Sequence, residues 1–483
     1  MERNPAATSE TTFDLVVIGA GIYGTAAALE ASRRGLKVLV VDRGDFGGGT
    51  TWNSFRILHG GLRYLQTLDL VRFRESVRAR SWYVDEFPTL IEPLECLMPL
   101  YGQGRRRAAL LRPALAANQL LRQLWSSKAE TGRIPESSLV SSETVKRRFP
   151  GVRSPGLKGG AIWFDGYLPQ PQRLLIEMLR RASAWGAAAL NYVEATGWAM
   201  DDGQIAGVEV RDLLTGKGMT MRAGAVLNCG GPWAADIAET LVPATDVAFT
   251  PTLAFNLLLA RRIDSDVTVA VEPAGGGRTY FLHPRGQTTL AGTYHVPAVR
   301  PGSLPTDQQI AAFLADLSAA VPGFEPRSEH VLRVMPGTLP AGGPGSDTPA
   351  NRDLWVDHGN EGGPRGVFTL IGTKYTTAPW AAQRAIDRIA DRCVQRVSGH
   401  PARGVEPDVR HVPGWEEFAQ LNRDDPAGAA ELVCTLIEDE NVTSLDDLLL
   451  RRTDWGLVPS EYAAAADIVR RLCPELRGRS DGG

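Results

Sequence analysis

Three glycines and one aspartate have the residue types and the spacing of a dinucleotide site. Gly19, Gly21 and Gly24 lie in the run Gly-Ala-Gly-Ile-Tyr-Gly, and Asp42 follows about one helix and one strand later. In such a run the first glycine permits a tight turn, the second lets the backbone approach a pyrophosphate, and the third lets a helix pack closely on a strand. Asp42 can accept hydrogen bonds from a ribose. The pattern predicts a pyrophosphate at a helix N-terminus, where N–H groups and the helix dipole favour anions.

The segments on either side of this run are the elements that would position it. Residues 15–18 are apolar and β-branched, which is typical of a buried parallel strand. Residues 25–34 have a helical pattern, and residues 36–41 are a second apolar run that ends at Asp42. A lone glycine run is a weak signal. The order of strand, turn, helix, strand and acid favours dinucleotide binding over an ordinary glycine-rich turn.

The composition is that of a globular protein with two or three domains. The chain has 483 residues, of which 43% are hydrophobic and 22% charged, and its 52 basic and 55 acidic residues give a net charge of −3. This charge argues against nucleic acid as the main partner. The five cysteines are sparse and lack CxxC spacing, so we expect reduced thiols, no metal site and a cytoplasmic location. We expect no membrane span, because no apolar run approaches the roughly 20 residues that one needs.

Polar residues downstream of Asp42 suit a loop against a cofactor ring. A stretch rich in glycine and threonine, residues 44–51, precedes the run Ile-Leu-His-Gly-Gly-Leu-Arg-Tyr-Leu at residues 57–65. Apolar strands return at residues 225–228 and 367–371, and Gly-Thr-Lys follows the second of them. The nucleotide domain is therefore expected to consist of separated segments. This interruption favours FAD over NAD, because FAD stays bound through turnover and needs a longer, enclosed cradle.

At this point the chain resembles the FAD-dependent glycerol-3-phosphate dehydrogenase family, part of the larger group of D-amino-acid-oxidase-like flavoproteins. The resemblance runs in collinear order over nearly the whole chain. Its segments are residues 57–65, 161–187, 225–234, 290–296, 351–353, 371–377 and 443–457. The last segment resembles the helical C-terminal domain of that family, which looks shortened here.

The resemblance implies an α/β fold, α+β overall, with a Rossmann-like FAD-binding domain, a substrate domain on a mixed β-sheet and a small helical C-terminal domain. The expected ranges are residues 12–75, 160–240 and 348–397 for the FAD-binding domain, residues 76–159 and 241–347 for the substrate domain, and residues 405–483 for the helical domain. FAD would be bound non-covalently, and covalent attachment at His59 is the alternative. The residues expected at the FAD site are Gly19, Gly21, Gly24, Asp42, Thr50, Thr51, Ser54, His59, Gly61, Val193, Gly230, Gly372, Thr373 and Thr376.

The resemblance also implies a phosphate clamp of arginine, tyrosine and lysine. Arg63 and Tyr64 match the family's Arg-Tyr pair, Arg352 matches a second arginine, and Lys374 matches the lysine of a Gly-Gly-Lys turn. The second glycine of that turn is Thr373 here. Arginine can bind a phosphate bidentately, and several cations hold a dianion best. The alternatives are surface ion pairs for the two arginines and a helix-start cation for Lys374.

Two presumed substrate positions depart from the family. Asn256 stands where the family has a histidine, and Met335 where it has an arginine. Arg333, two residues before Met335, could substitute as a substrate contact. Asn256 could orient a substrate hydroxyl at the catalytic centre, but asparagine cannot act as a base. We therefore expect a shifted substrate preference.

Three further residues complete the expected catalytic centre. His295 and His283 are alternative bases, although a lone histidine on a strand is usually structural. Lys374, with the N–H groups beside it, would place positive charge where the reduced flavin is negative.

The resemblance implies an FAD-dependent dehydrogenase that oxidises sn-glycerol 3-phosphate, or a related anionic secondary alcohol, to the ketone by hydride transfer to flavin N5. Electrons would pass to a quinone or another acceptor. The alternatives are an amine or amino-acid oxidase or dehydrogenase of the same superfamily, and a catalytically inactive flavin-binding protein. A homodimer is left open. The basic amphipathic stretch at residues 105–125 could touch the inner face of a membrane, or could be an ordinary solvated helix.

Overall fold

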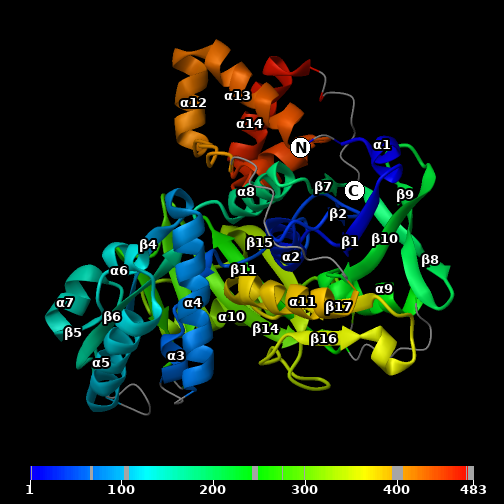
Figure 1. Ribbon diagram of the computed structural model, residues 1–483. Coiled ribbons are helices and arrows are strands. Elements are labelled where there is room, and N and C mark those ends of the chain that lie inside the picture. Colours follow the sequence, from blue (N-terminus) through cyan, green and yellow to red (C-terminus); the bar gives the residue numbers. More distant parts are fainter. Residues whose placement is uncertain are drawn as a thin grey trace.

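The computed structural model describes residues 1–483 except residues 2, 66–68, 103–107, 242–248, 275, 299, 394–405, 475 and 477–483. In the described part the chain forms two large sheets, an eight-stranded and a nine-stranded one, and a group of C-terminal helices (Figure 1). The helices are α1 (Pro5–Ser9), α2 (Ile22–Arg33), α3 (Leu62–Leu65), α4 (Leu70–Glu86), α5 (Ala108–Trp125), α6 (Lys128–Arg133), α7 (Ser142–Arg148), α8 (Pro171–Ala184), α9 (Ala234–Leu241), α10 (Asp307–Ala320), α11 (Ala378–Cys393), α12 (Trp415–Asp424), α13 (Pro426–Asp439) and α14 (Pro459–Leu472).

The first sheet carries the dinucleotide motif at its centre. Its main path runs β16-β17-β10-β1-β2-β7, and β9 joins β8 to β10. The strands of this path from β17 to β7 are parallel, and β16 is antiparallel to β17. The strands are β1 (Thr12–Ile18), β2 (Val38–Val41), β7 (Ala188–Leu190), β8 (Val193–Asp201), β9 (Gln204–Asp212), β10 (Gly218–Asn228), β16 (Leu354–Asp357) and β17 (Val367–Ile371).

Alternate residues of β1 face two separate apolar cores, which explains why this strand is apolar throughout. Leu15 and Val17 pack with residues of α2, α8 and α11 on one face. Val16 and Ile18 pack with residues of the β8–β10 strands on the other. A parallel strand covered on both faces loses the polar alternation of a half-exposed strand. The strands predicted to return to this sheet, residues 225–228 and 367–371, are present as β10, which pairs with β1, and β17, which pairs with β10.

The second sheet is mixed and follows the path β15-β11-β14-β13-β12-β4-β6-β3, with β5 paired to β6. Helix α10 covers its core through Phe313, Leu314 and Leu317. The strands are β3 (Ile57–Leu58), β4 (Glu92–Leu100), β5 (Ser138–Val140), β6 (Gly159–Tyr167), β11 (Pro251–Leu259), β12 (Thr268–Val271), β13 (Tyr280–Arg285), β14 (Thr288–Pro297) and β15 (Val331–Pro340).

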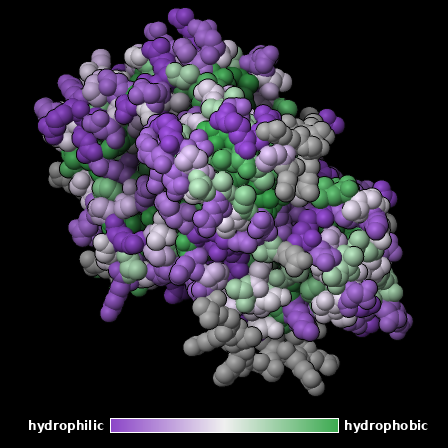
Figure 2. Space-filling view, turned by 90° about the horizontal axis from the view of Figure 1, so that it is seen from above, coloured by the Kyte–Doolittle hydropathy of each residue, from purple (hydrophilic) through white to green (hydrophobic). Residues whose placement is uncertain are grey.

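The C-terminal region is helical, as predicted, and has its own core. Helices α12, α13 and α14 and the π-helix at Asp447–Arg452 surround Trp455, which is fully buried. The ring of Phe418 stacks on Trp455 at 3.6 Å between centroids. Figure 1 shows these helices as a separate layer next to α8. Seen from above, hydrophilic residues dominate this side of the molecule, and hydrophobic ones appear in small groups between them (Figure 2).

Two strands that lie within the predicted ranges of the FAD-binding domain pair in the second sheet. Strand β3 pairs with β6, and β6 pairs with β4. The domain boundaries stay a prediction. Tyr192, with a φ of 55°, lies between β7 and β8.

A buried ion pair joins α8 to the C-terminal region and generates a stability prediction. Arg173 donates two hydrogen bonds of 2.8 Å to Glu440, and both side chains are at most 1% exposed. Glu440→Gln should lower the free energy of unfolding by about 3 kcal/mol, because it leaves buried guanidinium charge without its full partner.

The matched control for this change is Asp439→Asn. Asp439 is 52% exposed and pairs with Arg410, which also pairs with Glu440. An exposed pair contributes less than about 1 kcal/mol. Denaturant unfolding of the two variants and the parent gives both values. Equal losses for Glu440→Gln and Asp439→Asn would contradict the assignment.

Candidate functional site

The glycine turn between β1 and α2 is as tight as its sequence predicts. Gly19 has a φ of 99°, and a Cβ on Gly24 would lie only 1.9 Å from the carbonyl oxygen of Gly19. A Cβ on Gly19 would in turn lie 2.5 Å from the carbonyl oxygen of Cys229, at the end of β10. Gly21 begins α2 without a side-chain cap. The start of α2 thus faces the edge of the sheet with backbone N–H groups, the arrangement that binds phosphate.

Asp42 and the loop after it lie on this turn. Asp42 accepts hydrogen bonds from the N–H of Ala20 at 2.7 Å and of Gly44 at 2.9 Å. Burial raises the pKa of the Asp42 carboxyl, and these two donors oppose that effect. Thr51 Oγ1 accepts a 3.0 Å hydrogen bond from the N–H of Ile22 in the first turn of α2. The predicted cofactor residues Asp42 and Thr51 therefore meet at the glycine turn.

The remaining predicted residues of this edge lie at strand ends or in the loop. Val193 donates its N–H to the carbonyl oxygen of Asp42 at 2.8 Å, and Gly230 directly follows Cys229 after β10. Thr50 Oγ1 donates to the carbonyl oxygen of Thr338 in β15, which links the loop to the second sheet. Ser54 Oγ is buried and has no hydrogen-bond partner among the described residues. Free backbone N–H groups, a carboxylate and an unpaired buried hydroxyl fit a polar nucleotide cofactor such as FAD.

The turn after β17 packs directly on α2. A Cβ on Gly372 would lie 1.8 Å from the ring of Tyr23, so only glycine fits there. Tyr23 OH lies 2.9 Å from two acceptors for its one proton, Asp353 Oδ1 and the carbonyl oxygen of Lys374. Thr373 donates its N–H and its hydroxyl to the same Asp353 oxygen, at 3.1 and 3.3 Å. Asp353 therefore explains how threonine replaces the second glycine of the expected Gly-Gly-Lys turn.

His59 is connected to a buried charge network that the sequence did not reveal. The ring Nδ1 of His59 lies 3.2 Å from Asp165 Oδ2. The backbone N–H of His59 donates to Thr376 Oγ1 at 3.2 Å. Asp165 also accepts the N–H of Gly60 at 2.7 Å and contacts the guanidinium of Arg80. Burial alone would raise the pKa of the Asp165 carboxyl, but His59, Arg80 and the Gly60 N–H hold it below its usual value. The His59 side chain is 51% exposed, so an ionised carboxylate orients an accessible imidazole.

The glycines of the His-Gly-Gly run let the loop approach α4. A Cβ on Gly60 would lie 2.0 Å from Arg80 Nη1, and one on Gly61 would lie 2.8 Å from Ser76 Cβ. Gly61 has a φ of 83°. Gly61 follows the His59-Gly60 pair in this loop, and this position is consistent with its predicted contact with the cofactor. Sequence spacing alone gave no signal for Asp165, because this residue lies about a hundred positions away in β6.

Lys374 and Arg352 line one cleft, and Tyr64 contacts Lys374. Lys374 Nζ hydrogen-bonds to Tyr64 OH, and the ammonium lies 4.7 Å from the centre of the same ring. Lys374 and Arg352 line a cleft of about 660 Å³ between the start of α4, residues 351–355 and α11. Arg384 also lines it. The backbone of Arg63 lies in α3 beside Tyr64, but its side chain is outside the described part of the structure.

Arg333 lies in a different environment from the one predicted. Its guanidinium donates to the carbonyl oxygens of Leu457 at 2.9 Å and Gly456 at 2.8 Å, and it lies over the ring of Trp52. This geometry does not support its predicted role as a substrate contact. Met335 is fully buried in an apolar cluster, so it offers no substitute.

The other candidates for the catalytic centre are held within the second sheet. Asn256 donates to the carbonyl oxygen of Asn53 and accepts from Thr293 Oγ1, both at 2.8 Å, so both ends of its amide are engaged. His295 pairs with Ala254 across β14 and β11. His283 lies 2.8 Å from Thr268 Oγ1, and burial and two arginines lower its pKa to about 4. No contact joins these residues to His59 in the described structure.

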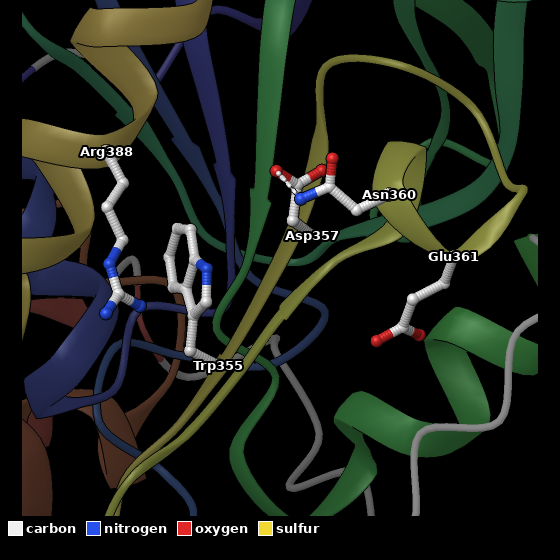
Figure 3. A pocket seen from close by; sticks show the side chains of 5 residues that line it. All are labelled: Trp355, Asp357, Asn360, Glu361 and Arg388. Carbon is white, nitrogen blue, oxygen red and sulfur yellow. Dashed lines mark hydrogen bonds between the residues drawn. The ribbon is translucent and has the colours of Figure 1, made fainter.

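A second hollow, of about 440 Å³, opens at the edge strand β16 and contains none of the predicted site residues. Figure 3 shows Arg388 of α11 facing the ring of Trp355, while Asn360 hydrogen-bonds to Asp357. Glu361 points elsewhere in this view (Figure 3). Trp355 and Arg388 also line the cleft of about 660 Å³, so the two hollows share one wall.

Known proteins match the chain over most of its length. The family model for FAD dependent oxidoreductases matches residues 14–388. "Glycerol-3-phosphate dehydrogenase" of Synechocystis sp. is 27% identical over 406 residues, which cover 80% of this chain and 71% of that protein. "Glycerol-3-phosphate dehydrogenase 1" of Mycobacterium tuberculosis is 28% identical over 505 aligned residues, covering 95% and 94% of the two chains.

A solved structure confirms the fold class. The glycerol-3-phosphate dehydrogenase from Bacillus halodurans, complexed with FAD, superposes with a TM-score of 0.70 at 20% identity and covers 98% of this chain and 93% of its own. The predicted α/β fold, the FAD cofactor and the resemblance stated from the sequence are thereby confirmed. The chain belongs to the family of FAD-dependent oxidoreductases.

Proposed function

We propose that this FAD-dependent oxidoreductase oxidises sn-glycerol 3-phosphate, or a closely related small anionic secondary alcohol, to the ketone. The observation that supports it is a cleft that Lys374 and Arg352 line at the turn after β17, with Tyr64 hydrogen-bonded to Lys374. A phosphate needs several cations and hydroxyl donors within one small volume. The names of the relatives from Synechocystis and M. tuberculosis agree with this substrate class.

The structure offers a base for the same reaction in His59. Asp165 is ionised and accepts from His59 Nδ1, so Nε2 is left as the acceptor for a substrate hydroxyl proton. FAD, when bound, accepts a hydride. The residues of this chain then have to orient the carbinol carbon, hold the phosphate and take the hydroxyl proton. The engaged amide of Asn256 favours His59 over the centre expected from the sequence.

The rival substrate class is an amine or amino acid. Arg352 could also bind the carboxylate of an amino acid. Oxidation of a neutral amine to an imine, however, needs no strong base. An oriented and accessible His59–Asp165 pair is more useful to an alcohol, whose hydroxyl proton must leave. The same pair also argues against an inactive flavin-binding protein. The electron acceptor is proposed to be a quinone or another external oxidant.

The clamp can be tested with Arg352→Met. Losing a charged hydrogen-bond partner costs about 1.5–3 kcal/mol, so KM for glycerol 3-phosphate should rise roughly ten- to a hundred-fold with FAD retained. Arg327→Met is the control, because Arg327 is 68% exposed, pairs with the exposed Glu329 and does not line the cleft. Steady-state assays with an artificial acceptor give both values. An unchanged KM in Arg352→Met would exclude the clamp.

The base can be tested with His59→Asn, which removes the acceptor nitrogen and keeps a small polar side chain. The rate of flavin reduction by substrate should fall by about 10²–10⁴-fold. His295→Gln, at the alternative base, should change that rate little. Anaerobic rapid-mixing absorbance measures the rate in both variants. A larger loss in His295→Gln than in His59→Asn would reverse the assignment.

We also propose that α5 contacts an anionic membrane surface. Leu120 and Leu124 are 60% and 68% exposed, and Val71 at the start of α4 is 70% exposed. The rings of Phe73 and Trp125 join α4 to α5. The basic residues 105–107 lie outside the described residues. Within the described part, no helix has the length and apolar character to cross a bilayer.

This contact predicts that the protein co-sediments with anionic vesicles at low salt and leaves them at high salt, because salt screens the attraction. The double change Leu120→Ser and Leu124→Ser should abolish co-sedimentation. Leu304→Ser, at a 72% exposed leucine in another part of the chain, should not. Equal binding of the protein to neutral and anionic vesicles would count against the proposal.

A further inference from the structure

A short segment of the C-terminal region contacts both the loop after β2 and the second sheet. We refer to residues 450–457 as the C-terminal bridge. Trp52 Nε1 donates to the carbonyl oxygen of Leu450, and Arg333 of β15 donates to that of Gly456 at 2.8 Å. Arg285 of β13 pairs with Asp454 at 2.6 Å. The bridge therefore joins the loop after Asp42 to the second sheet.

The strongest contact of the bridge is a buried ionic cluster around Asp45. Arg452 donates to both oxygens of Asp45 at 2.8 Å, and Arg451 Nε donates to Oδ2 at 2.9 Å. The side chains of Asp45 and Arg452 are 1% and 0% exposed. Asn191 adds a further 2.8 Å hydrogen bond to Asp45. Asp447 accepts from Arg451 at 2.8 Å, so Arg451 links two carboxylates.

Asp45 begins the loop that lies on the glycine turn. Two residues later, Gly47 donates its N–H to the carbonyl oxygen of Ala20 at 3.0 Å. Thr51, at the other end of this loop, accepts the N–H of Ile22. The position of residues 45–51 against the phosphate-binding end of α2 is therefore fixed at Asp45 by two arginines from the far end of the chain.

We propose that Arg451 and Arg452 are positioning residues for FAD, and that the C-terminal region controls cofactor affinity through Asp45. A buried carboxylate that loses its cations is costly, so the loop would move to bring Asp45 into water. That movement would withdraw Thr51 from the first turn of α2. Coupling between two sites is reciprocal, so FAD binding must in turn stabilise the bridge. The inference concerns the cofactor alone and does not depend on which alcohol is oxidised.

The test is the affinity of folded apoprotein for FAD, measured by quenching of flavin fluorescence. Arg451→Gln should raise the Kd for FAD roughly ten- to thirty-fold, because it removes charged hydrogen bonds that hold the loop. The matched control is Arg410→Gln. Arg410 pairs with Glu440 and Asp439 of the same region, and neither pair includes Asp45. The Kd of the Arg410→Gln variant for FAD should stay within about twofold of the Kd of the parent protein, even if the Tm of the variant falls.

A purely structural role would lower the Tm of both variants and leave the Kd of both unchanged, which would overturn the proposal. Hydrogen exchange on the unaltered protein provides the second measurement and needs no variant to fold. Adding FAD to the apoprotein should slow exchange at residues 447–457 as well as at residues 45–51. Protection confined to residues 45–51 would equally overturn the proposal.

Discussion

The close approach of three backbone segments at the glycine turn is the constraint on which this structure depends. Gly24 lies against the carbonyl of Gly19, and Gly19 lies against the carbonyl of Cys229, at distances that no Cβ could occupy. These contacts hold α2 directly on the ends of β1 and β10. The ends of β2 and β17 bring Asp42 and Gly372 to the same edge. The site is therefore built where the carboxyl ends of parallel strands meet, which is where open α/β sheets bind ligands.

Charges that are buried and paired then connect this edge to more distant parts of the chain. Asp165 connects His59 to α4 and β6, and Asp353 connects the turn after β17 to Tyr23 on α2. Asp45 connects the loop over the glycine turn to the C-terminal region. Each carboxylate collects several donors, as a buried charge must. Three separate carboxylates thus hold His59, the turn after β17 and the loop after Asp42 in place.

The sequence predicted the parts of the site that depend on local pattern. The strand at residues 15–18, the glycine run and the returning strands at 225–228 and 367–371 all lie where they were expected, because short-range periodicity and glycine spacing determine them. The partners of His59 and Asp45 were not predictable, since β6 and the C-terminal bridge approach these residues only in the folded chain. The sequence also did not indicate that Arg333 would contact the bridge, because Gly456 and Leu457 lie far from it in the chain. The pairing of β3 with β6 was not predictable either, because antiparallel pairing between distant segments leaves no mark in either one.

The central claim is that a secondary alcohol carrying an anionic group gives its C2 hydrogen to the bound flavin. The most direct measurement is anaerobic flavin reduction by glycerol 3-phosphate that carries deuterium at C2, compared with the unlabelled compound. The account predicts bleaching of the flavin, dihydroxyacetone phosphate as the product, and slower reduction by the deuterated substrate. Flavin that is reduced by an amino acid and not by any anionic alcohol would contradict the account.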